Sequence, residues 1–240
     1  MISIRFRYFF PGVLIMFSIL TMLGALGRGP STAHASERLP APDSDLPTPK
    51  AGEIRTVVFA GGCFWCTEGA IRQFRGVKDV VSGYAGGTKE TADYKTVCSG
   101  TTGHAESIKI TYDPAVITYA QLLQIFFAAH DPTTLDRQGN DAGHQYRSAI
   151  FYANDDEKKV AGAYIKKLND TKAVGSPVVT TLEPLTAFYP AEEYHQDYVT
   201  NNPNAGYVRA CALPHMQKVR KEYKEWLKTD AEKATEPKKP

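Results

Sequence analysis

The sequence predicts a two-layer domain of the α/β or α+β class, in which helices pack against a sheet. Short β-branched runs alternate with segments that place apolar residues at helical spacing, at the lengths of ordinary strands and helices. Hydrophobic residues make up 42% of the chain and charged residues 22%, which is near the average of folded proteins. With 240 residues and no internal repeat, the chain is expected to hold one domain, over residues 54–227.

The first strand and the first helix of this domain meet at a glycine-rich turn. Residues 56–60, "TVVFA", form a short β-branched run that ends in two glycines. Residues 67–76 then carry apolar side chains at helical spacing, and Gly76 ends the pattern. The intervening "GGCFWC" is therefore predicted to be a strand-to-helix turn, with Cys63 near the start of the helix.

A second strand is predicted by the strict alternation of residues 104–112, "HAESIKITY". Glu106 falls on the same face as two isoleucines, and the pattern is typical of a half-buried strand. A helix is expected over residues 118–130, where Thr118 and Gln121 have the spacing of a capping box.

The rest of the domain alternates in the same way between β-branched runs and amphipathic segments. The expected elements are a strand over residues 145–153, a helix over 155–170, a strand over 177–183 and a closing helix over 215–227.

The N-terminal residues have the three parts of a signal peptide. A basic start precedes an apolar core over residues 13–26, and Ala33 and Ala35 then show the A-x-A spacing that signal peptidase recognises. We therefore predict a signal peptide over residues 1–35, its removal, and export to the periplasm or another extracytoplasmic compartment. The alternative is an uncleaved anchor, because the apolar run is near the lower length of a membrane span.

Two stretches without periodicity flank the domain. Residues 36–53, "SERLPAPDSDLPTPKAGE", predict a flexible linker, and residues 228–240 predict a disordered charged tail. Without the first 35 residues the chain carries 25 basic and 26 acidic residues. This balance indicates neither nucleic-acid binding nor a basic membrane surface.

The cysteines are the main candidates for chemistry. All four, Cys63, Cys66, Cys98 and Cys211, lie after the signal segment, so an exported chain could form two disulfides. No metal site is indicated, because zinc ligation favours two close pairs of Cys or His and the chain has one. Cys63 fits a reactive thiol, since backbone N–H groups at a helix start stabilise a thiolate. The alternative is a buried thiol or an inert disulfide.

The residues near these cysteines include candidates for a pocket. Phe64 and Trp65 either plug the core or form an apolar pocket that suits a methyl group and excludes water. Glu106 is either a solvated carboxylate at a strand end or a buried one, whose raised pKa would make it a general acid. Tyrosine hydroxyls could donate hydrogen bonds in such a pocket. Further candidates, from polar stretches that contain glycine, are Tyr94, Asn140, Asp141 and Tyr146.

Several long motifs follow one another along the domain. They are "GGCFWCTEG", "GYAGG", "YKTVCSGTTGHAE", "HDPTT", "RQGNDAGHQYRSAIFY" and "AEEYHQDY" with "NPN" after it. In this order they resemble the peptide methionine sulfoxide reductases of the A class, over residues 56–207. The resemblance implies an α+β fold, a two-layer sandwich with a central mixed sheet and flanking helices.

The resemblance also implies a reaction, the reduction of free or protein-bound methionine sulfoxide, with selectivity for the S epimer at sulfur. By position, Cys63 matches the nucleophile and Glu106 matches the acid that protonates the sulfoxide oxygen. The other matches are Tyr94 and Tyr146 as the hydroxyls that hold this oxygen, Asp141 as a second carboxylate, and Phe64 and Trp65 as walls around the substrate methyl. We expect a monomer without a cofactor, restored by a thioredoxin-like dithiol.

Two positions depart from the family's pattern. Cys66 stands where many members have Gly, and Val208 stands where many have a C-terminal resolving cysteine, with Cys211 three residues later. We hypothesise that Cys66 resolves the sulfenic acid on Cys63, since it lies one helical turn away in a C-x-x-C pair. The alternative is Cys211, which could instead be a structural residue in an extended segment. Cys98 is interpreted as structural.

Two other classes of function fit parts of the pattern. A thioredoxin-like thiol–disulfide oxidoreductase also has C-x-x-C between a strand and a helix, but it gives no role to Glu106, Tyr94 or Tyr146. A binding module with a structural C-x-x-C would keep its function in a Cys63→Ser variant.

Overall fold

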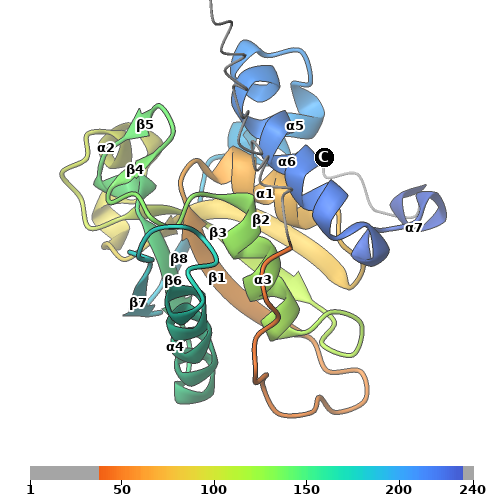
Figure 1. The fold of residues 1–240 in the computed structure, drawn as a ribbon. Coiled ribbons are helices and arrows are strands. Elements are labelled where there is room, and N and C mark those ends of the chain that lie inside the picture. The colour runs from red at the N-terminus through yellow and green to blue at the C-terminus, as the bar shows by residue number, and fades with distance from the viewer. Residues whose placement is uncertain (1–37, 235–240) are drawn as a thin grey trace, which may run out of the picture. The chain divides into compact units, whose positions relative to one another are not determined.

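A six-stranded sheet forms the centre of the fold (Figure 1). The structure is a computed structural model that describes residues 38–234. Its strands are β1 (Arg55–Gly61), β2 (Val77–Ala85), β3 (Ala105–Tyr112), β6 (Ser148–Tyr152), β7 (Thr181–Pro184) and β8 (Phe188–Pro190). They lie in the order β7-β6-β1-β3-β2-β8. The β6–β7 pair is parallel and the other pairs are antiparallel, so the sheet is mixed, as predicted.

The longer helices pack on one face of this sheet. They are α1 (Phe64–Arg72), α3 (Tyr119–Ala129), α4 (Asp155–Asp170) and α6 (Leu213–Glu222). Ile71, Phe126 and Leu168 of these helices share a buried core with Phe59 and Ile108 of the sheet. The opposite face carries a smaller apolar cluster, made by Val58, Ala60, Ala85, Ala105, Ala149 and Phe151 and covered by Leu185 and Phe188. The predicted α+β class with two layers is confirmed.

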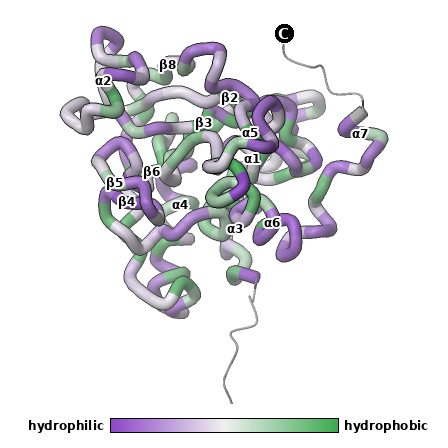
Figure 2. Tube along the Cα trace, turned by 90° about the horizontal axis from the view of Figure 1, so that it is seen from above, coloured by the Kyte–Doolittle hydropathy of each residue, from purple (hydrophilic) through white to green (hydrophobic). Residues whose placement is uncertain are grey.

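Short elements connect these layers. They are the helices α2 (Tyr94–Cys98), α5 (Tyr198–Asn201) and α7 (Asp230–Ala234), the 3-10 turns Lys89–Thr91, His144–Tyr146, Glu193–His195 and Lys224–Trp226, and the π-helical turn Val208–Ala212. A hairpin of β4 (Arg137–Gln138) and β5 (Asp141–Ala142) is mostly hydrophilic (Figure 2).

The predicted strand-to-helix turn is present, and Gly62 makes it possible. β1 ends at Gly61, Gly62 has a φ of 85°, and Cys63 is the N-cap of α1. A side chain on Gly62 would place its Cβ 2.5 Å from Cβ of Gln138 in β4. Glycine is therefore required both by the backbone conformation and by the close approach of the hairpin.

β3 lies between β1 and β2 in the sheet, and it is more deeply buried than its sequence pattern predicts. The predicted face is correct, because Glu106, Ile108 and Ile110 are all buried. The strand is not half-buried, however, since Ala105 and Ser107 on its other face are buried as well. The second apolar cluster covers that face, which local alternation cannot indicate.

Several element boundaries differ from the prediction. The capping box of Thr118 and Gln121 and the helix over residues 155–170 are confirmed. The strand expected from residue 145 begins at Ser148, after a 3-10 turn, and the next begins at Thr181. The closing helix begins earlier than expected and ends at Glu222, before a 3-10 turn. β2 and β8 were not predicted.

The segment before the domain also differs from the expected flexible linker over residues 36–53. The described part, residues 38–53, lies along the helical layer, with Leu39 and Leu46 packed against the core. The carbonyl of Pro40 accepts a hydrogen bond from the Tyr164 hydroxyl at 2.9 Å, and Asp45 Oδ1 accepts one from the Ala120 N–H at 3.1 Å. Two leucines and the backbone-restricting prolines thus allow a Pro-rich segment to dock.

The predicted signal peptide over residues 1–35 lies outside the described residues, as does most of the tail. Of the expected disordered tail 228–240, residues 230–234 form α7. Between residues 38 and 234, no helix combines the length and apolarity needed to cross a bilayer.

Candidate active site

Two free thiols lie side by side on the first turn of α1. Cys63 caps the helix, and its carbonyl accepts hydrogen bonds from the N–H groups of Cys66 at 3.1 Å and Thr67 at 3.3 Å. Cys63 and Cys66 are both buried, and their side chains are hydrogen-bonded to each other. The helical turn therefore places the two sulfur atoms where a bond between them needs little backbone movement.

Glu106 meets the start of this helix from the neighbouring strand β3. Its side chain is 2% exposed, and its Oε2 accepts a hydrogen bond from the Phe64 N–H at 3.1 Å. Burial raises the pKa of Glu106 to about 8, and the negative charge of Asp141 adds to the shift. The carboxyl group is therefore mainly protonated at neutral pH and can donate a proton beside Cys63.

The electrostatics of the thiols differ from the sequence-based expectation. Burial raises the pKa of Cys63 well above its usual value, and the hydrogen bond to Cys66 and the charge of Glu106 raise it further. The pKa of Cys66 is lowered, because it accepts a hydrogen bond from Cys63 and one involving Tyr207. Burial therefore opposes the stabilisation of a Cys63 thiolate that the helix start predicts, and the Phe64 N–H at this helix start donates to Glu106.

Two tyrosines complete the side of the site that Cys63 faces. Tyr94 begins α2, and Tyr146 lies in the 3-10 turn before β6. Burial raises the pKa of both hydroxyls, and the charges of Glu106 and Cys63 raise it further. Both hydroxyls therefore stay protonated near the acid and the thiol, where they can donate hydrogen bonds to a bound oxygen.

Asp141 and Tyr207 lie next to Cys66, and Tyr207 also interacts with Cys63. The Tyr207 hydroxyl donates a hydrogen bond to Asp141 Oδ2 at 2.5 Å and lies 3.8 Å from Sγ of Cys66. These residues line a cavity of about 220 Å³ that also contains Cys63, Asn140 and Cys211. The cavity gives a small molecule access to both thiols.

Phe64 and Trp65 belong to a cluster of rings at this helix start. The indole of Trp65 stacks on Tyr198 with ring centroids 3.7 Å apart, and its Nε1 donates a hydrogen bond to His195 Nδ1 at 3.2 Å. Phe64 is 1% exposed and packs between Trp65, Tyr94 and His195. The two aromatic residues of "CFWC" are therefore fixed by neighbours instead of lying free at the surface.

The family model for peptide methionine sulfoxide reductase matches residues 55–227 of this chain. The chain belongs to this family. It is 46% identical to a peptide methionine sulfoxide reductase of Deinococcus radiodurans over 195 residues, which cover 81% of this chain and 94% of the relative. A reductase of Thermus thermophilus is 49% identical over 176 residues, 73% of this chain and 98% of the relative.

Solved structures agree with this assignment. Reduced Mxr1 from Saccharomyces cerevisiae has a TM-score of 0.61 at 36% identity, covering 66% of this chain and 91% of that one. Methionine sulfoxide reductase A of Corynebacterium diphtheriae has a TM-score of 0.56 at 32% identity, covering 70% and 86%. The protein is therefore an enzyme, an oxidoreductase that reduces methionine sulfoxide. Membership of the peptide methionine sulfoxide reductase family does not agree with the two alternatives, a thioredoxin-like oxidoreductase and a binding module.

The structure of the reductase brings together all the residues selected from the sequence. Glu106, Tyr94 and Tyr146 lie near Cys63. Asp141 lies near Cys66, and its charge also acts on Glu106 and Tyr146. Phe64 and Trp65 follow Cys63 in α1. Three side chains of the site were not selected, namely His195, Tyr198 and Tyr207. "AEEYHQDY" and "AGYV" contained them, but only the fold shows that these segments reach α1.

The other two cysteines are placed differently from expectation. Cys211 lies in the π-helical turn Val208–Ala212, not in an extended segment, and it lines the cavity of the thiol pair. Cys98 ends α2, is partly exposed, and is hydrogen-bonded to the Tyr94 hydroxyl. Cys98 thus contacts a residue of the site.

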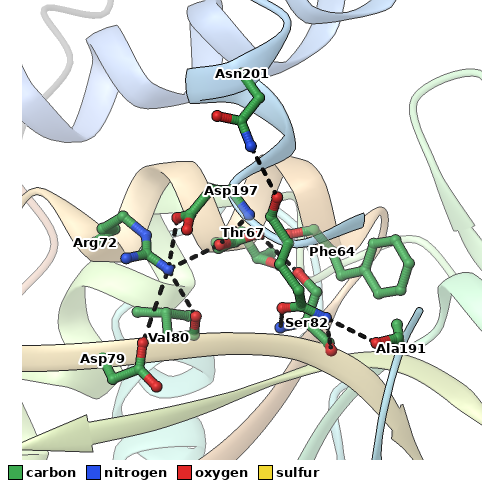
Figure 3. Close-up of polar contacts among 11 residues, drawn as sticks. Phe64, Thr67, Arg72, Asp79, Val80, Ser82, Ala191, Asp197 and Asn201 are labelled. Carbon is green, nitrogen blue, oxygen red and sulfur yellow. Dashed lines mark hydrogen bonds and ion pairs between the residues drawn. The ribbon is translucent and has the colours of Figure 1, made fainter. Parts of the chain in front are cut away.

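A buried polar network holds α1 against β2 and the segment that follows β8. Glu68 Oε2 accepts a hydrogen bond from Ser82 Oγ at 2.8 Å, and Glu68 Oε1 accepts one from the Asp197 N–H at 3.0 Å. Arg72 pairs with Asp197 at 2.8 Å and donates to the carbonyl of Val80, as Figure 3 shows. These contacts fix residues 191–201 relative to the helix that carries both thiols.

Proposed function

We propose that Cys63 attacks the sulfur of methionine S-sulfoxide, free or in a protein, while Glu106 protonates the sulfoxide oxygen. The observation that carries this proposal is the meeting of a buried, protonated carboxyl with Cys63 at the start of α1. The S–O bond of the substrate breaks, methionine leaves, and the oxygen ends on Cys63 as a sulfenic acid. Tyr94 and Tyr146 hold the oxygen, and Phe64 and Trp65 enclose the methyl group.

Cys63 is a better candidate for the attacking thiol than Cys66, despite its raised pKa. The pKa values of Tyr94 and Tyr146 respond to the charge of Cys63, which supports its position beside the proposed oxygen site. Sγ of Cys66 lies 3.8 Å from the Tyr207 hydroxyl, which also interacts with Cys63. A sulfoxide whose oxygen meets Glu106 and the tyrosines would present its sulfur to Cys63.

We propose that Cys66 resolves the sulfenic acid. Its sulfur attacks the sulfenic sulfur of Cys63, a Cys63–Cys66 disulfide forms, and water leaves. The hydrogen bond between the two side chains and the lowered pKa of Cys66 support this step. Cys211 is the second candidate, because it lines the same cavity.

Mass mapping after one turnover without reductant tests this order of events. Cys63 and Cys66 fall between Arg55 and Arg72 in one tryptic peptide, so their bond appears as the loss of two hydrogens and of both alkylation sites. The wild type should show this peptide, and Cys66→Ser should give a dimedone adduct on Cys63. Cys98→Ser serves as the matched control. A Cys63–Cys211 bond with Cys66 alkylated contradicts the proposal.

We further propose that the enzyme is an exported monomer that is restored by a thioredoxin-like dithiol. The signal-peptide pattern of residues 1–35 supports export. Exposed residues of the thiol cavity, among them Asn140 and Ala210, support access of such a dithiol to the proposed disulfide. Intact mass of the protein from cell fractions tests export, and a cytoplasmic chain that begins at Met1 contradicts it.

A further inference from the structure

The carboxylate of Glu192 binds two tyrosines that lie 98 and 108 residues earlier in the chain. Its Oε1 accepts a hydrogen bond from the Tyr94 N–H at 2.9 Å, and its Oε2 accepts one from the Tyr84 hydroxyl at 2.9 Å. Tyr94 is one of the two tyrosines proposed to hold the substrate oxygen. One side chain therefore ties the backbone of a residue of the site to the central sheet.

The backbone next to Glu192 is fixed by the edge of the sheet. β8 pairs with β2 from Phe188 to Pro190, and the Ala191 N–H then donates to the carbonyl of Ser82 at 2.9 Å, as Figure 3 shows. Tyr84 lies on the same strand β2 and is fully buried, so its hydroxyl meets Glu192 from a fixed position. The Glu192 side chain is partly exposed, yet both of its oxygens are bound.

The charge of Glu192 strengthens both of these hydrogen bonds. Burial would raise the pKa of this carboxyl group, but the hydrogen bonds from the Tyr94 N–H and the Tyr84 hydroxyl lower it below its usual value. Burial raises the pKa of the Tyr84 hydroxyl, so this hydroxyl keeps its proton and remains a donor. Hydrogen bonds to an ionised carboxylate are stronger than those between neutral groups. Glu192 is thus a firm attachment for Tyr94.

The helix that carries Tyr94 depends on such an attachment. α2 has five residues, which is too short for a helix to be stable by itself. The side chain of Asp93 caps it, and Val97 packs in the buried core. Glu192 binds the first N–H of this helix, at the residue that carries the proposed oxygen-binding hydroxyl. The position of Tyr94 is therefore set from β8 and β2 as well as from α2 itself.

We propose that Glu192 is a positioning residue that holds Tyr94 where its hydroxyl donates a hydrogen bond to the sulfoxide oxygen. This proposal rests on the proposed role of Tyr94 in holding that oxygen. Glu192 does not contact the substrate in it and acts through the Tyr94 backbone. A donor assists the reaction only at the place where charge develops, and a misplacement of about 1 Å can slow a reaction about a hundredfold. Loss of Glu192 should therefore slow the reaction and leave substrate binding largely unchanged.

The test measures the rate of single-turnover methionine formation against the concentration of methionine S-sulfoxide. Glu192→Ala should lower the maximal rate about ten- to a hundredfold, the factor that a lost hydrogen bond to a charged group supplies. The half-saturating concentration should change little, and one methionine per enzyme should still form. Glu192→Gln, whose amide oxygen can accept from the Tyr94 N–H, should retain most of the rate. Glu192→Asp keeps the charge but is one methylene shorter, so it should be slowed. Glu193→Ala, at the neighbouring exposed glutamate, is the matched control.

A double-mutant cycle distinguishes positioning of Tyr94 from general destabilisation. In a Tyr94→Phe background, which lacks the hydroxyl, adding Glu192→Ala should change the rate by less than about twofold. The same loss in both backgrounds, or a wild-type rate in Glu192→Ala or Glu192→Asp, overturns the proposal for Glu192. If Tyr94→Phe by itself keeps the wild-type rate, the proposed role of Tyr94 fails, and the role of Glu192 fails with it.

Alkylation of Cys98 gives an independent readout of α2. Cys98 ends this helix, is partly exposed and is hydrogen-bonded to the Tyr94 hydroxyl. In a background with the other three cysteines changed to serine, Cys98 is the only thiol, so iodoacetamide reports it alone. Glu192→Ala should raise its rate of alkylation, whereas Glu192→Gln and Glu193→Ala should not. An unchanged rate in Glu192→Ala contradicts the proposal.

Discussion

Replacing Glu106 by glutamine should make the reductase slower and more stable at the same time. The amide keeps the shape of the side chain and can still accept the hydrogen bond from the Phe64 N–H, but it cannot donate an acidic proton. Positioned general acids contribute roughly 10²- to 10⁴-fold in rate. Single-turnover methionine formation should therefore slow by about this factor, while substrate binding persists.

The stability effect follows from the pKa of Glu106, which burial raises from 4.5 to about 8. Between these two values the unfolded chain has released the proton that the folded protein keeps, so the free energy of unfolding falls as pH rises through this range. At about 1.4 kcal/mol per pH unit, the carboxyl group costs about 3 kcal/mol of stability at pH 7. Glutamine removes this cost in stability. The gain is reduced by the free energy of burying its amide NH₂ group without a hydrogen-bond partner.

Two measurements check this reasoning. Urea unfolding at pH 5, 6, 7 and 8 should show that the difference in stability between Glu106→Gln and the wild type grows with pH. The rate of methionine formation in the wild type should fall near pH 8 as Glu106 ionises, and this decrease should be absent from the variant. Glu157→Gln, at another buried glutamate outside the site, is the control. A variant that turns over at the wild-type rate, or a pH-independent stability difference, refutes the reasoning.

The remaining predictions concern the resolving step, the turn and the docked N-terminal segment. Cys66→Ser should release one equivalent of methionine per enzyme in a quenched single turnover but turn over more slowly with a thioredoxin-like protein dithiol, because no Cys63–Cys66 disulfide forms for it to reduce; equal steady-state rates would contradict the resolving role. Gly62→Ala should destabilise the protein by about 2–4 kcal/mol in urea unfolding, because a side chain there meets both a positive φ and Gln138. Its matched control is Gly52→Ala, which has a φ of 72° but nothing within 4 Å of the added Cβ, and a smaller loss is expected there. A chain that begins at Lys50 should unfold at a lower temperature than one that begins at Ser36, because it lacks Leu39, Pro40 and Asp45. The expected loss in the free energy of unfolding is about 1–3 kcal/mol. Equal melting temperatures would show that the segment does not stabilise the domain.

Much of the local structure follows from neighbouring residues alone. The capping box at Thr118, the amphipathic helix of residues 155–170 and the turn at "GGCFWC" depend on side-chain and backbone preferences within a few residues. They were accordingly predicted correctly. β2 was not, because a strand with a lysine, an aspartate and a glycine is stabilised by its neighbours β3 and β8 and not by its own pattern.

Residue identity at fixed spacing is enough to recognise the family, the fold class and the residues that the family's motifs supply. How the site is held together depends on contacts between distant segments. The fold placed Glu106 on the Phe64 N–H at the start of α1, and it brought Tyr207 to Cys66 and His195 to Trp65 from more than a hundred residues away. The physical reason is that burial and hydrogen bonding between distant segments set the pKa values and the ring positions, and neither is encoded by local spacing.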